Sequence, residues 1–327
     1  MKREVIEALK ANKDQFISGA ALSRLLGVSR TAVWKVIQQL KDEGYKIESV
    51  SRKGYRLMED ADRLDADALM AELGSDSLIQ VVKHFDSIDS TNTYAKQVAT
   101  EDAAEGMLII AEEQLTGRGR LGRQWSSPKG TGVWMSLILR PDIDPREASK
   151  ITQIGAAAMA EAIEDITGLP AGIKWPNDII VSGKKVCGIL TEMSAELNTI
   201  NYVVVGIGVN VNTPSFPEDL KPIATSLYQE SEKMVSRKSL VRGFAGHFTR
   251  LYGDFLSSGA LDMTREICLK RSVTVGRDVR IIHRGVTTNA HAVDIDPNGE
   301  LVVDYEDGRR ETIFYGEVSV RARNGYI

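Results

Sequence analysis

The chain has 327 residues, of which 43% are hydrophobic and 26% are charged, a composition typical of a soluble globular protein with two or three domains. No apolar run approaches the roughly 20 residues of a membrane span, and the first residues lack the apolar region of a signal peptide, so we expect a cytoplasmic protein with no membrane partner. Two cysteines and four scattered histidines exclude a disulfide framework and predict no metal site built from protein ligands.

Charge is distributed unevenly along the chain. Residues 1–56 contain 12 basic and 6 acidic residues, a net charge of +6, whereas the rest of the chain contains 29 basic and 39 acidic residues, a net charge of −10. A basic module joined to an acidic body indicates nucleic-acid binding by the N-terminal module. The acidic body argues against a protein that does nothing but bind DNA.

The first module, residues 1–60, is predicted to be a helix-turn-helix. Helices are expected near residues 20–26 and 30–41, with Gly27 in the left-handed position that ends the first and Ser29 as N-cap of the second. In the second helix, apolar residues recur at i, i+3, i+4 and i+7 and should pack inward: Val33, Val36, Ile37 and Leu40.

A basic hairpin is expected after these helices. Residues 45–58 alternate like two strands around Arg52, Lys53 and Gly54, the pattern of a wing. A purely structural three-helix bundle is the alternative, but such bundles seldom keep an exposed face and a hairpin tip so basic. The outer helix face and the wing supply the candidate DNA contacts, which are Ser29, Arg30, Thr31, Trp34, Lys35, Gln38, Arg52 and Lys53.

The body is predicted to consist of a linker, an α+β core and a β domain. Residues 61–83 read as a linker with one short helix. Strand-like and helix-like segments mix over residues 84–270, and short turns between consecutive strands indicate a largely antiparallel or mixed sheet. Residues 271–327 contain five short strand-like segments with turns at 297–299 and 307–308, which suggests a small barrel.

The loop GRGRLG, residues 117–122, has the spacing of a dinucleotide-binding turn. Such a turn must open a helix, but here a further loop and another strand follow, so the dinucleotide interpretation fails. The same interpretation of GIGVNVN, residues 206–212, fails as well. The guanidiniums of Arg118, Arg120 and Arg123 instead predict a glycine-hinged loop that closes over phosphates and excludes water. The alternative is an ordinary solvated basic hairpin.

The motif KWPND, residues 174–178, places polar groups at the entrance of an expected strand. The amide of Asn177 and the carboxylate of Asp178 precede a hairpin whose return strand starts at Lys184 and Lys185. A carboxylate, an amide and a lysine at neighbouring strand ends could steer an amine nucleophile and hold an acyl phosphate. Taken alone, however, a Pro-Asn-Asp sequence is usually only a turn.

A third motif, Ser90, Thr91 and Asn92, opens a predicted helix. Hydroxyl, amide and free backbone N–H groups converge at such a position. The group either caps the helix and does nothing more, or also recognises a compact polar head such as a ureido or amide group.

Taken in order, the motifs STN, EEQLTGRGRLGRQW, KWPNDI, KKVCGIL and GIGVNVN, behind a helix-turn-helix, resemble those of biotin–protein ligases of the bifunctional, repressor type. The resemblance covers essentially the whole chain. It implies an α+β fold with an N-terminal winged helix-turn-helix, a central mixed sheet with helices like a class II synthetase core, and a small C-terminal SH3-like β-barrel.

The resemblance also implies an activity and partners. Biotin and Mg·ATP, with Mg²⁺ as the accompanying metal, would give biotinyl-5′-adenylate and pyrophosphate. The adenylate would then acylate one lysine of a biotin carboxyl carrier domain. The adenylate would also act as corepressor, because the loaded enzyme would form a homodimer, bind operator DNA and repress biotin genes.

By resemblance, four residues are catalytic. Lys185 would contact the biotin carboxylate and the α-phosphate, and Asp178 would position or deprotonate the acceptor lysine. Arg118 and Arg120 would act with them. The implied binding residues for biotin, ATP and the adenylate are Ser90, Thr91, Asn92, Gln114, Arg118, Gly119, Arg120, Trp125, Asn177, Lys185, Gly188, Ile189 and Asn210.

Some of these binding residues have specific implied roles. Trp125 would stack on adenine or help to close the loop, Gly188 and Ile189 would shape the biotin pocket, and Asn210 would reach the triphosphate or its Mg²⁺. Leu121 stands where some relatives carry another basic residue, which lowers the charge of the loop.

Two other functions are compatible with parts of the sequence. A ligand-sensing repressor with a non-catalytic ligase core would not need Lys185, Asp178 and the arginine loop together. A lipoate or octanoate transferase could share the core, but the RGR loop, the KWPND motif and the helix-turn-helix favour biotin.

Overall fold

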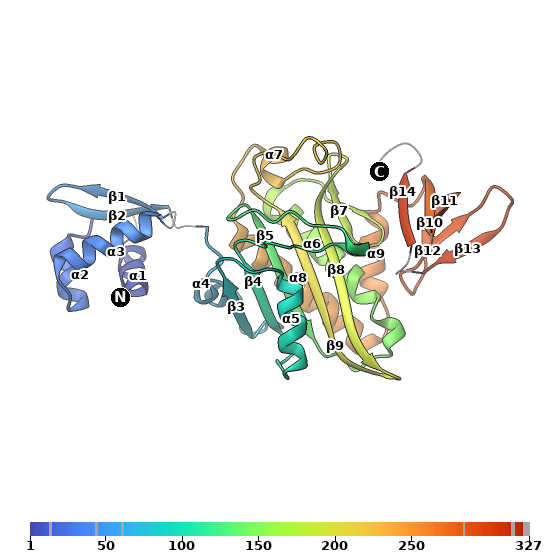
Figure 1. The fold of residues 1–327 in the computed structure, drawn as a ribbon, viewed down its shortest axis with the longest axis horizontal. Helices are drawn as coiled ribbons and strands as arrows, with labels where there is room; N and C mark the ends of the chain where they lie inside the picture. Colours follow the sequence, from blue (N-terminus) through green and yellow to red (C-terminus); the bar gives the residue numbers. More distant parts are fainter. Residues whose placement is uncertain (13–14, 43–44, 60–61, 284, 315–317, 323–327) are drawn as a thin grey trace. The chain divides into compact units, whose positions relative to one another are not determined.

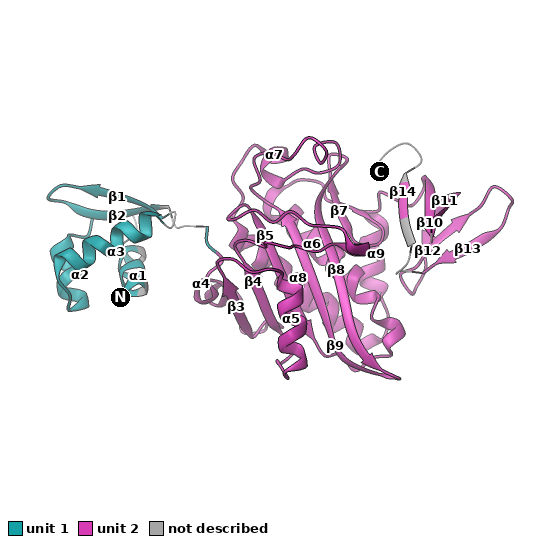
Figure 2. Ribbon diagram, viewed as in Figure 1, with its two compact units in different colours: residues 1–63 teal, residues 64–327 magenta. Residues whose placement is uncertain are grey.

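The computed structural model consists of two compact units, residues 1–63 and residues 64–327 (Figure 2). Each unit has a hydrophobic core of its own. The structure describes the whole chain apart from residues 13–14, 43–44, 60–61, 284, 315–317 and 323–327.

The first unit is a winged helix-turn-helix, as predicted. Three helices precede a two-stranded antiparallel hairpin. The elements are α1 (Lys2–Ala11), α2 (Gly19–Leu26), α3 (Arg30–Asp42), β1 (Lys46–Val50) and β2 (Gly54–Glu59).

Local sequence explains where the helices of this unit begin and end. Gly27 ends α2 with φ of 64°, a left-handed conformation that glycine adopts at little cost. The Ser29 hydroxyl accepts a hydrogen bond from the backbone N–H of Ala32 at 3.1 Å and so caps α3. The four apolar residues predicted to face inward from α3 are all buried, namely Val33, Val36, Ile37 and Leu40.

The second unit contains a seven-stranded mixed sheet (Figure 1). β3 and β4 pair in parallel, and all the other pairs are antiparallel. The strands, in their order across the sheet, are β3 (Val81–Phe85), β4 (Met107–Ala111), β5 (Gly132–Leu139), β9 (Thr199–Asn210), β8 (Lys184–Glu196), β7 (Asp178–Val181) and β6 (Gly172–Lys174).

Helices cover both faces of this sheet. α5 (Thr91–Thr100) packs on one face, where Ala95 and Ala99 meet Val204 of β9. α6 (Lys150–Thr167) and α8 (Arg237–Ser258) form a layer behind the other face (Figure 1). The sequence predicted these two long helices, but not α7 (Leu227–Ser231) and α9 (Asp262–Lys270).

The segment 61–83, which the sequence presents as a linker, contributes to the second unit. It contains the expected short helix, α4 (Ala66–Glu72), and also the start of β3. The unit begins at Leu64, and its core includes the side chains of Leu64, Leu69, Leu73 and Ile79. The description as a linker is therefore corrected from Leu64 onward, because apolar residues spaced along the segment are buried against the sheet and α8.

The C-terminal strands form an antiparallel sheet in the order β13-β12-β11-β10-β14. The predicted turns lie in this sheet, and Gly299 and Gly308 adopt φ of 84° and 81°. The five predicted strands are β10 (Asp278–His283), β11 (Val286–Ile295), β12 (Leu301–Asp304), β13 (Arg310–Ile313) and β14 (Val318–Ala322).

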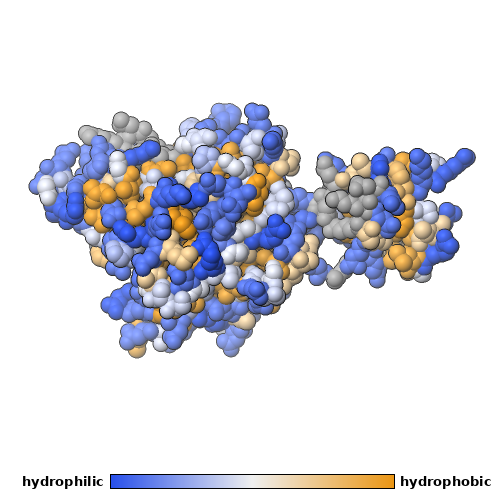
Figure 3. Space-filling model, turned by 180° about the vertical axis from the view of Figure 1, so that it is seen from behind, coloured by the Kyte–Doolittle hydropathy of each residue, from blue (hydrophilic) through white to orange (hydrophobic). Residues whose placement is uncertain are grey.

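Figure 3 shows small groups of hydrophobic residues separated by hydrophilic ones on the face seen from behind. Among the described residues, no helix has the length and apolar character needed to span a membrane.

A buried ion pair joins four segments of the second unit. Arg237 Nη1 at the start of α8 lies 2.8 Å from Glu112 Oε2, just after β4, and both side chains are nearly inaccessible to water. The backbone N–H of Leu64 donates to Glu112 Oε1 at 2.9 Å, and Nε2 of His84 in β3 lies 3.7 Å from the same oxygen. Burial alone would raise the pKa of Glu112, but His84, Arg237 and the Leu64 N–H lower this pKa from 4.5 to about 2.

Removing one partner of this pair should destabilise the second unit strongly. In Arg237→Met, Glu112 would remain as a buried charge without its cation, which costs about 3–5 kcal/mol in the free energy of unfolding. Urea denaturation at pH 7 measures this loss. The matched control is Arg146→Met, which removes an exposed ion pair with Asp144 and should leave the urea midpoint unchanged. Equal midpoints for the two variants would contradict the prediction.

The same pair predicts a pH dependence of stability. The pKa of Glu112 is lower in the folded state than in the unfolded chain, so its stabilising effect is complete above about pH 4.5 and is lost as pH falls toward 2. In the double variant Glu112→Gln, Arg237→Met this part of the acid-induced loss should disappear. An unchanged slope of unfolding free energy against pH between 4.5 and 2 would contradict the assignment.

Candidate active site and nucleic-acid interface

A cavity of about 560 Å³ lies on the face of the sheet that α5 partly covers. Strand ends, the arginine loop after β4 and the segment after β9 line it. The structure brings together in this one cavity every residue predicted to be catalytic or to bind biotin and ATP: Ser90, Thr91, Asn92, Gln114, Arg118, Gly119, Arg120, Trp125, Asn177, Asp178, Lys185, Gly188, Ile189 and Asn210.

The floor of the cavity is made of glycines on two neighbouring strands. Gly188 of β8 and Gly208 of β9 are paired in register, and Gly206 lies on the same face two residues before Gly208. A Cβ on Gly206 would lie 2.0 Å from Asn92 Oδ1, and one on Gly208 would lie 2.5 Å from Trp125 Nε1. Side chains from α5 and from the arginine loop therefore lie directly on the backbone of the sheet, which explains the period-two glycines in GIGVNVN.

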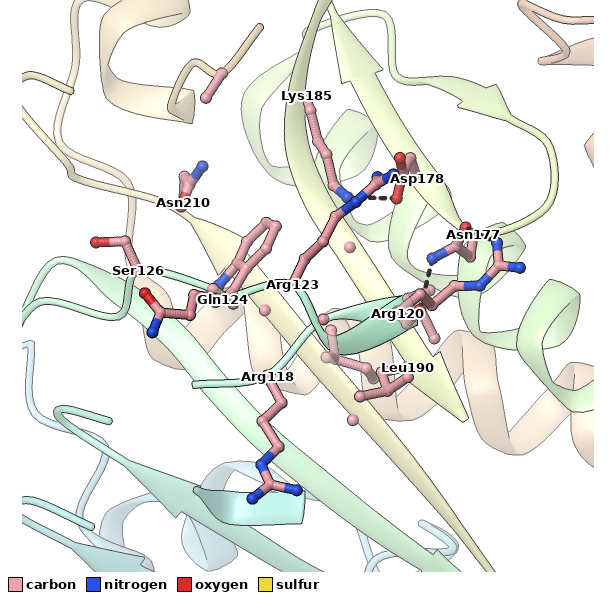
Figure 4. A pocket seen from close by; sticks show the side chains of 18 of the residues that line it. Arg118, Arg120, Arg123, Gln124, Ser126, Asn177, Asp178, Lys185, Leu190 and Asn210 are labelled. Carbon is pink, nitrogen blue, oxygen red and sulfur yellow. Dashed lines mark hydrogen bonds and ion pairs between the residues drawn. The ribbon is translucent and has the colours of Figure 1, made fainter. Parts of the chain in front are cut away.

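The arginine loop forms a narrow hairpin above this floor. The backbone N–H of Gly119 donates to the carbonyl of Arg123 at 2.7 Å, and β5 is the next strand after the loop. The dinucleotide interpretation is therefore correctly rejected, since the only helical residues in the loop are the short 3₁₀ turn Arg120–Gly122. Arg118 points away from Lys185 of β8, whereas Arg123 points toward Asp178 at the start of β7 (Figure 4).

The KWPND motif is the turn between β6 and β7. Arg120 Nη1 donates to Asn177 Oδ1 at 3.1 Å, and the Asn177 amide donates to the Ile189 carbonyl at 2.7 Å. Asp178 Oδ1 lies 2.6 Å from Lys185 Nζ (Figure 4). The predicted carboxylate, amide and lysine therefore meet, and the arginine loop contacts them.

The start of α5 is joined to the loop by a hydrogen-bond network. Ser90 caps the helix, as predicted. The Gln114 Oε1 atom accepts from the backbone N–H of Thr91 at 2.8 Å and from its hydroxyl at 3.0 Å, and Gln114 Nε2 donates to Ser127 Oγ at 2.9 Å. The Ser136 hydroxyl contacts Thr91 Oγ1 at 2.8 Å. Ser90, Thr91 and Gln114 form one polar wall of the cavity, and Ser127 and Ser136 support it by hydrogen bonds.

Asn92 and Asn210, two of the predicted binding residues, have partners within the protein. The Asn92 amide nitrogen donates to Glu192 Oε2 at 2.9 Å, so it also joins α5 to β8. The Asn210 amide donates to the carbonyl of Thr225 at 3.2 Å. Asn210 therefore holds the segment after β9, which pairs with Lys185 through the Thr225 N–H at 3.0 Å and contributes Phe216 to the lining.

Two basic residues that line the cavity, Lys174 and Arg321, have no role predicted from the sequence, whereas Arg123 is predicted only as one of the phosphate-binding guanidiniums of the loop. Burial lowers the pKa of Lys174 to about 8, against the opposing effect of Asp178. The nearby cations Lys185, Arg321 and Arg123 contribute to the same lowering. Lys174 and Arg123 stand inside motifs that the sequence analysis singled out, whereas nothing in the sequence marks Arg321.

The charge of the lining is strongly positive. Its described residues include six basic side chains and one carboxylate, that of Asp178. Lys185 Nζ also lies 5.1 Å from the ring centroid of Trp125, within range of a cation–π interaction. Such a lining fits an anionic ligand with several phosphate oxygens. Among the described residues, no three His, Cys, Asp or Glu side chains are grouped as metal ligands.

The first unit carries the predicted DNA-binding residues on its exposed face. Arg30, Thr31 and Lys35 of α3 are exposed, and Trp34 is 52% exposed. Gln38 is half-buried. The other predicted contacts are exposed, at the start of α3 and at the hairpin tip, namely Ser29, Arg52 and Lys53.

Comparison with known families agrees with this arrangement. Residues 84–210 match the Biotin/lipoate A/B protein ligase family. Residues 2–56 match an HTH domain family, and residues 274–321 match the Biotin protein ligase C terminal domain.

Individual relatives match over nearly the whole chain. The Bifunctional ligase/repressor BirA of Bacillus spizizenii is 39% identical over 310 residues, which cover 94% of this chain and 95% of that protein. The protein of the same name from Escherichia coli K12 is 30% identical over 317 residues, 96% of each chain. The solved structure of biotin protein ligase from Aquifex aeolicus in complex with biotin and ATP superposes with a TM-score of 0.66 at 28% identity, over 75% of this chain and all of that one. The chain belongs to the biotin protein ligase family, in its bifunctional ligase/repressor form.

Proposed function

We propose that the protein is an ATP-dependent biotin–protein ligase that also represses biotin genes. The observation that carries the ligase function is the cavity itself, where six basic side chains and one carboxylate surround a floor of bare glycine backbone. The basic side chains suit a polyphosphate, and the flat floor suits a slender aliphatic chain beside it. Biotin and ATP are the substrates, and biotinyl-5′-adenylate is the intermediate.

In the first step, a biotin carboxylate oxygen attacks the α-phosphorus of ATP and pyrophosphate leaves. Lys185 stabilises the charge that develops on the α-phosphate, and its pairing with Asp178 fixes its position before the substrates bind. Arg120 and Arg123 neutralise phosphate oxygens, and Arg118 closes over the adenylate as the loop folds inward. Mg²⁺ enters with ATP, bound mainly by the phosphates as part of the substrate.

In the second step, the ε-amine of a carrier lysine attacks the acyl carbon of the adenylate and AMP leaves. Asp178 accepts a hydrogen bond or the proton from this amine, and Asn177 keeps the turn in place. The partner is a biotin carboxyl carrier domain. Both steps would take place in the cytoplasm.

The polar wall of the cavity would recognise the ring system of biotin. Ser90, Thr91 and Gln114 present hydroxyl and amide groups that match a ureido group, and their mutual hydrogen bonds fix their orientation. The competing lipoate or octanoate transferase has no ureido group to bind. Parallel assays with biotin and lipoate distinguish the two functions.

Repression would depend on dimerisation. One module of this size makes few base contacts, so specific operator binding needs two copies on a two-fold site. Closure of the arginine loop over the adenylate would order backbone and lower the entropic cost of forming a homodimer, which couples the ligand to DNA binding. The carrier domain would compete for the surface of the second unit that forms the homodimer.

The roles of Lys185 and Asp178 predict different defects in the two steps. Lys185→Ala should slow pyrophosphate release by roughly 10²–10³-fold, the usual effect of removing one preorganised charge. Asp178→Ala should slow transfer from preformed adenylate to a carrier domain more than it slows adenylation. Lys184→Ala is the matched control, since Lys184 neighbours Lys185 but does not line the cavity. Equal defects of both site variants in both steps would refute the assignment.

The two-unit organisation predicts that DNA binding and ligation can be separated. A chain that starts at Leu64 should lose specific operator binding but keep most of its ligase activity, because each unit buries its own core. In the full chain, Arg30→Ala, Lys35→Ala or Arg52→Ala should weaken binding and reduce the salt slope by about one unit each. Lys129→Ala, which removes an exposed charge from the second unit, is the control. Specific operator binding by the shortened chain would refute this division.

A further inference from the structure

The turn between β6 and β7 is held at two points by the C-terminal part of the chain. The backbone N–H of Trp175 donates to Thr274 Oγ1 at 3.0 Å, and its indole Nε1–H donates to the carbonyl of Gly299 at 3.0 Å. Trp175 and Thr274 are both only 3% exposed. Water therefore does not compete for these bonds, which fix Trp175 by its backbone and by its side chain at once.

The two acceptors are themselves fixed. The Gly299 carbonyl, in the turn between β11 and β12, also accepts a hydrogen bond from Gln153 Nε2 of α6. A Cβ at Gly299 would lie 2.4 Å from that nitrogen, so α6 packs directly on the turn. The backbone N–H of Thr274 donates to Ser272 Oγ at 3.1 Å. Further hydrogen bonds therefore hold both acceptor residues, so that these residues can position the turn.

On the opposite side, the same turn carries groups of the active site. Lys174 precedes Trp175, and Asn177 and Asp178 follow within three residues. Asn177 bonds Arg120 and the backbone of β8, and Asp178 pairs with Lys185. A shift of Trp175 would therefore move the groups that hold the arginine loop and the catalytic lysine.

We propose that Thr274 Oγ1 and the carbonyl of Gly299 are positioning groups for the reaction, which through Trp175 set where the residues of the KWPND turn lie in the cavity. The proposal rests on the ligase function proposed above. It gives the segment before β10 and the turn between β11 and β12 a part in the chemistry that does not require contact between these groups and a substrate. Thr274 Oγ1 and the Gly299 carbonyl affect the rate by fixing the positions of the reacting groups. A misplacement of about 1 Å at a reacting group can lower the rate by about 10²-fold.

This role predicts a change in kcat rather than in KM for biotin. The wall assigned to biotin, at Ser90, Thr91 and Gln114, belongs to α5 and the loop after β4, and the Trp175 turn does not hold it. Loss of one Trp175 bond should therefore lower kcat for pyrophosphate release by about 10–10²-fold and leave KM for biotin within about twofold.

The pH profile gives a second readout, which a merely structural role would not change. Burial holds the pKa of Lys174 at about 8, and Asp178, Lys185, Arg321 and Arg123 are the charged groups that face it. In the wild type, kcat/KM for ATP should fall as Lys174 loses its proton above about pH 8, since this parameter reports the free enzyme. A loosened turn admits water and raises that pKa, so the alkaline limb should move to higher pH.

The experiment compares Thr274→Ala with Thr274→Ser in the full chain. Serine keeps the hydroxyl that accepts from Trp175, whereas alanine removes it. We expect the alanine variant to show the lower kcat and the shifted alkaline limb, and the serine variant to stay within about threefold of the wild type with an unshifted limb. Thermal unfolding of each variant shows whether it is folded at the assay temperature.

Trp175→Phe is the second variant, in case Thr274→Ala does not fold. It keeps a buried ring and removes only the bond to Gly299, so it should show the same kcat loss and the same pH shift. Wild-type rates and pH profiles in the folded alanine and phenylalanine variants would overturn the proposal, as would a rise in KM alone. A wild-type chain that releases no pyrophosphate from ATP with biotin would instead refute the ligase function itself.

Discussion

The arrangement of the active site depends on close approach to the backbone of two neighbouring strands. Where Gly206 and Gly208 face the cavity, Asn92 and Trp125 lie at distances that exclude even a methyl group on the sheet. The opposite face of β9 is continuous with the main core through Val205, Ile207 and Val209. A strand with large apolar side chains on one face and glycines on the other can pack against the core with the first face. The glycine face then leaves space for the cavity.

Charge is the second constraint on the cavity. Six cations around one carboxylate repel one another, and the pairing of Lys185 with Asp178 together with the bond from Arg120 to Asn177 holds part of this set in place. The depressed pKa of Lys174, one of these six, shows the cost of burying a cation there. A site of this kind is prepared for an anion, because an incoming polyphosphate relieves repulsion that the fold already contains.

The sequence predicts this site well wherever the information is local. The period of two in GIGVNVN, the missing helix after GRGRLG and the start of a helix at Ser90 are all set by neighbouring residues. The long helices and the strands other than β3 and β6 follow from their periodicity. Short elements such as α7 and α9 carry too few turns to show a period. Contacts between distant residues, such as Trp175 with Gly299 or the entry of Arg321 into the lining, depend on how the elements pack. Leu64 reads as part of a linker in the sequence, because its partner Glu112 lies 48 residues away.

That contact of Leu64 has a consequence for the history of such chains. The first residue of the second unit donates its backbone N–H to the carboxylate that pairs with Arg237, so the ion-pair network is completed by the chain immediately after the DNA-binding unit. None of the groups described in this network comes from residues 1–63. The boundary is therefore a natural point of recombination, where a gene could gain, exchange or lose a DNA-reading module while the enzyme encoded downstream keeps its core closed.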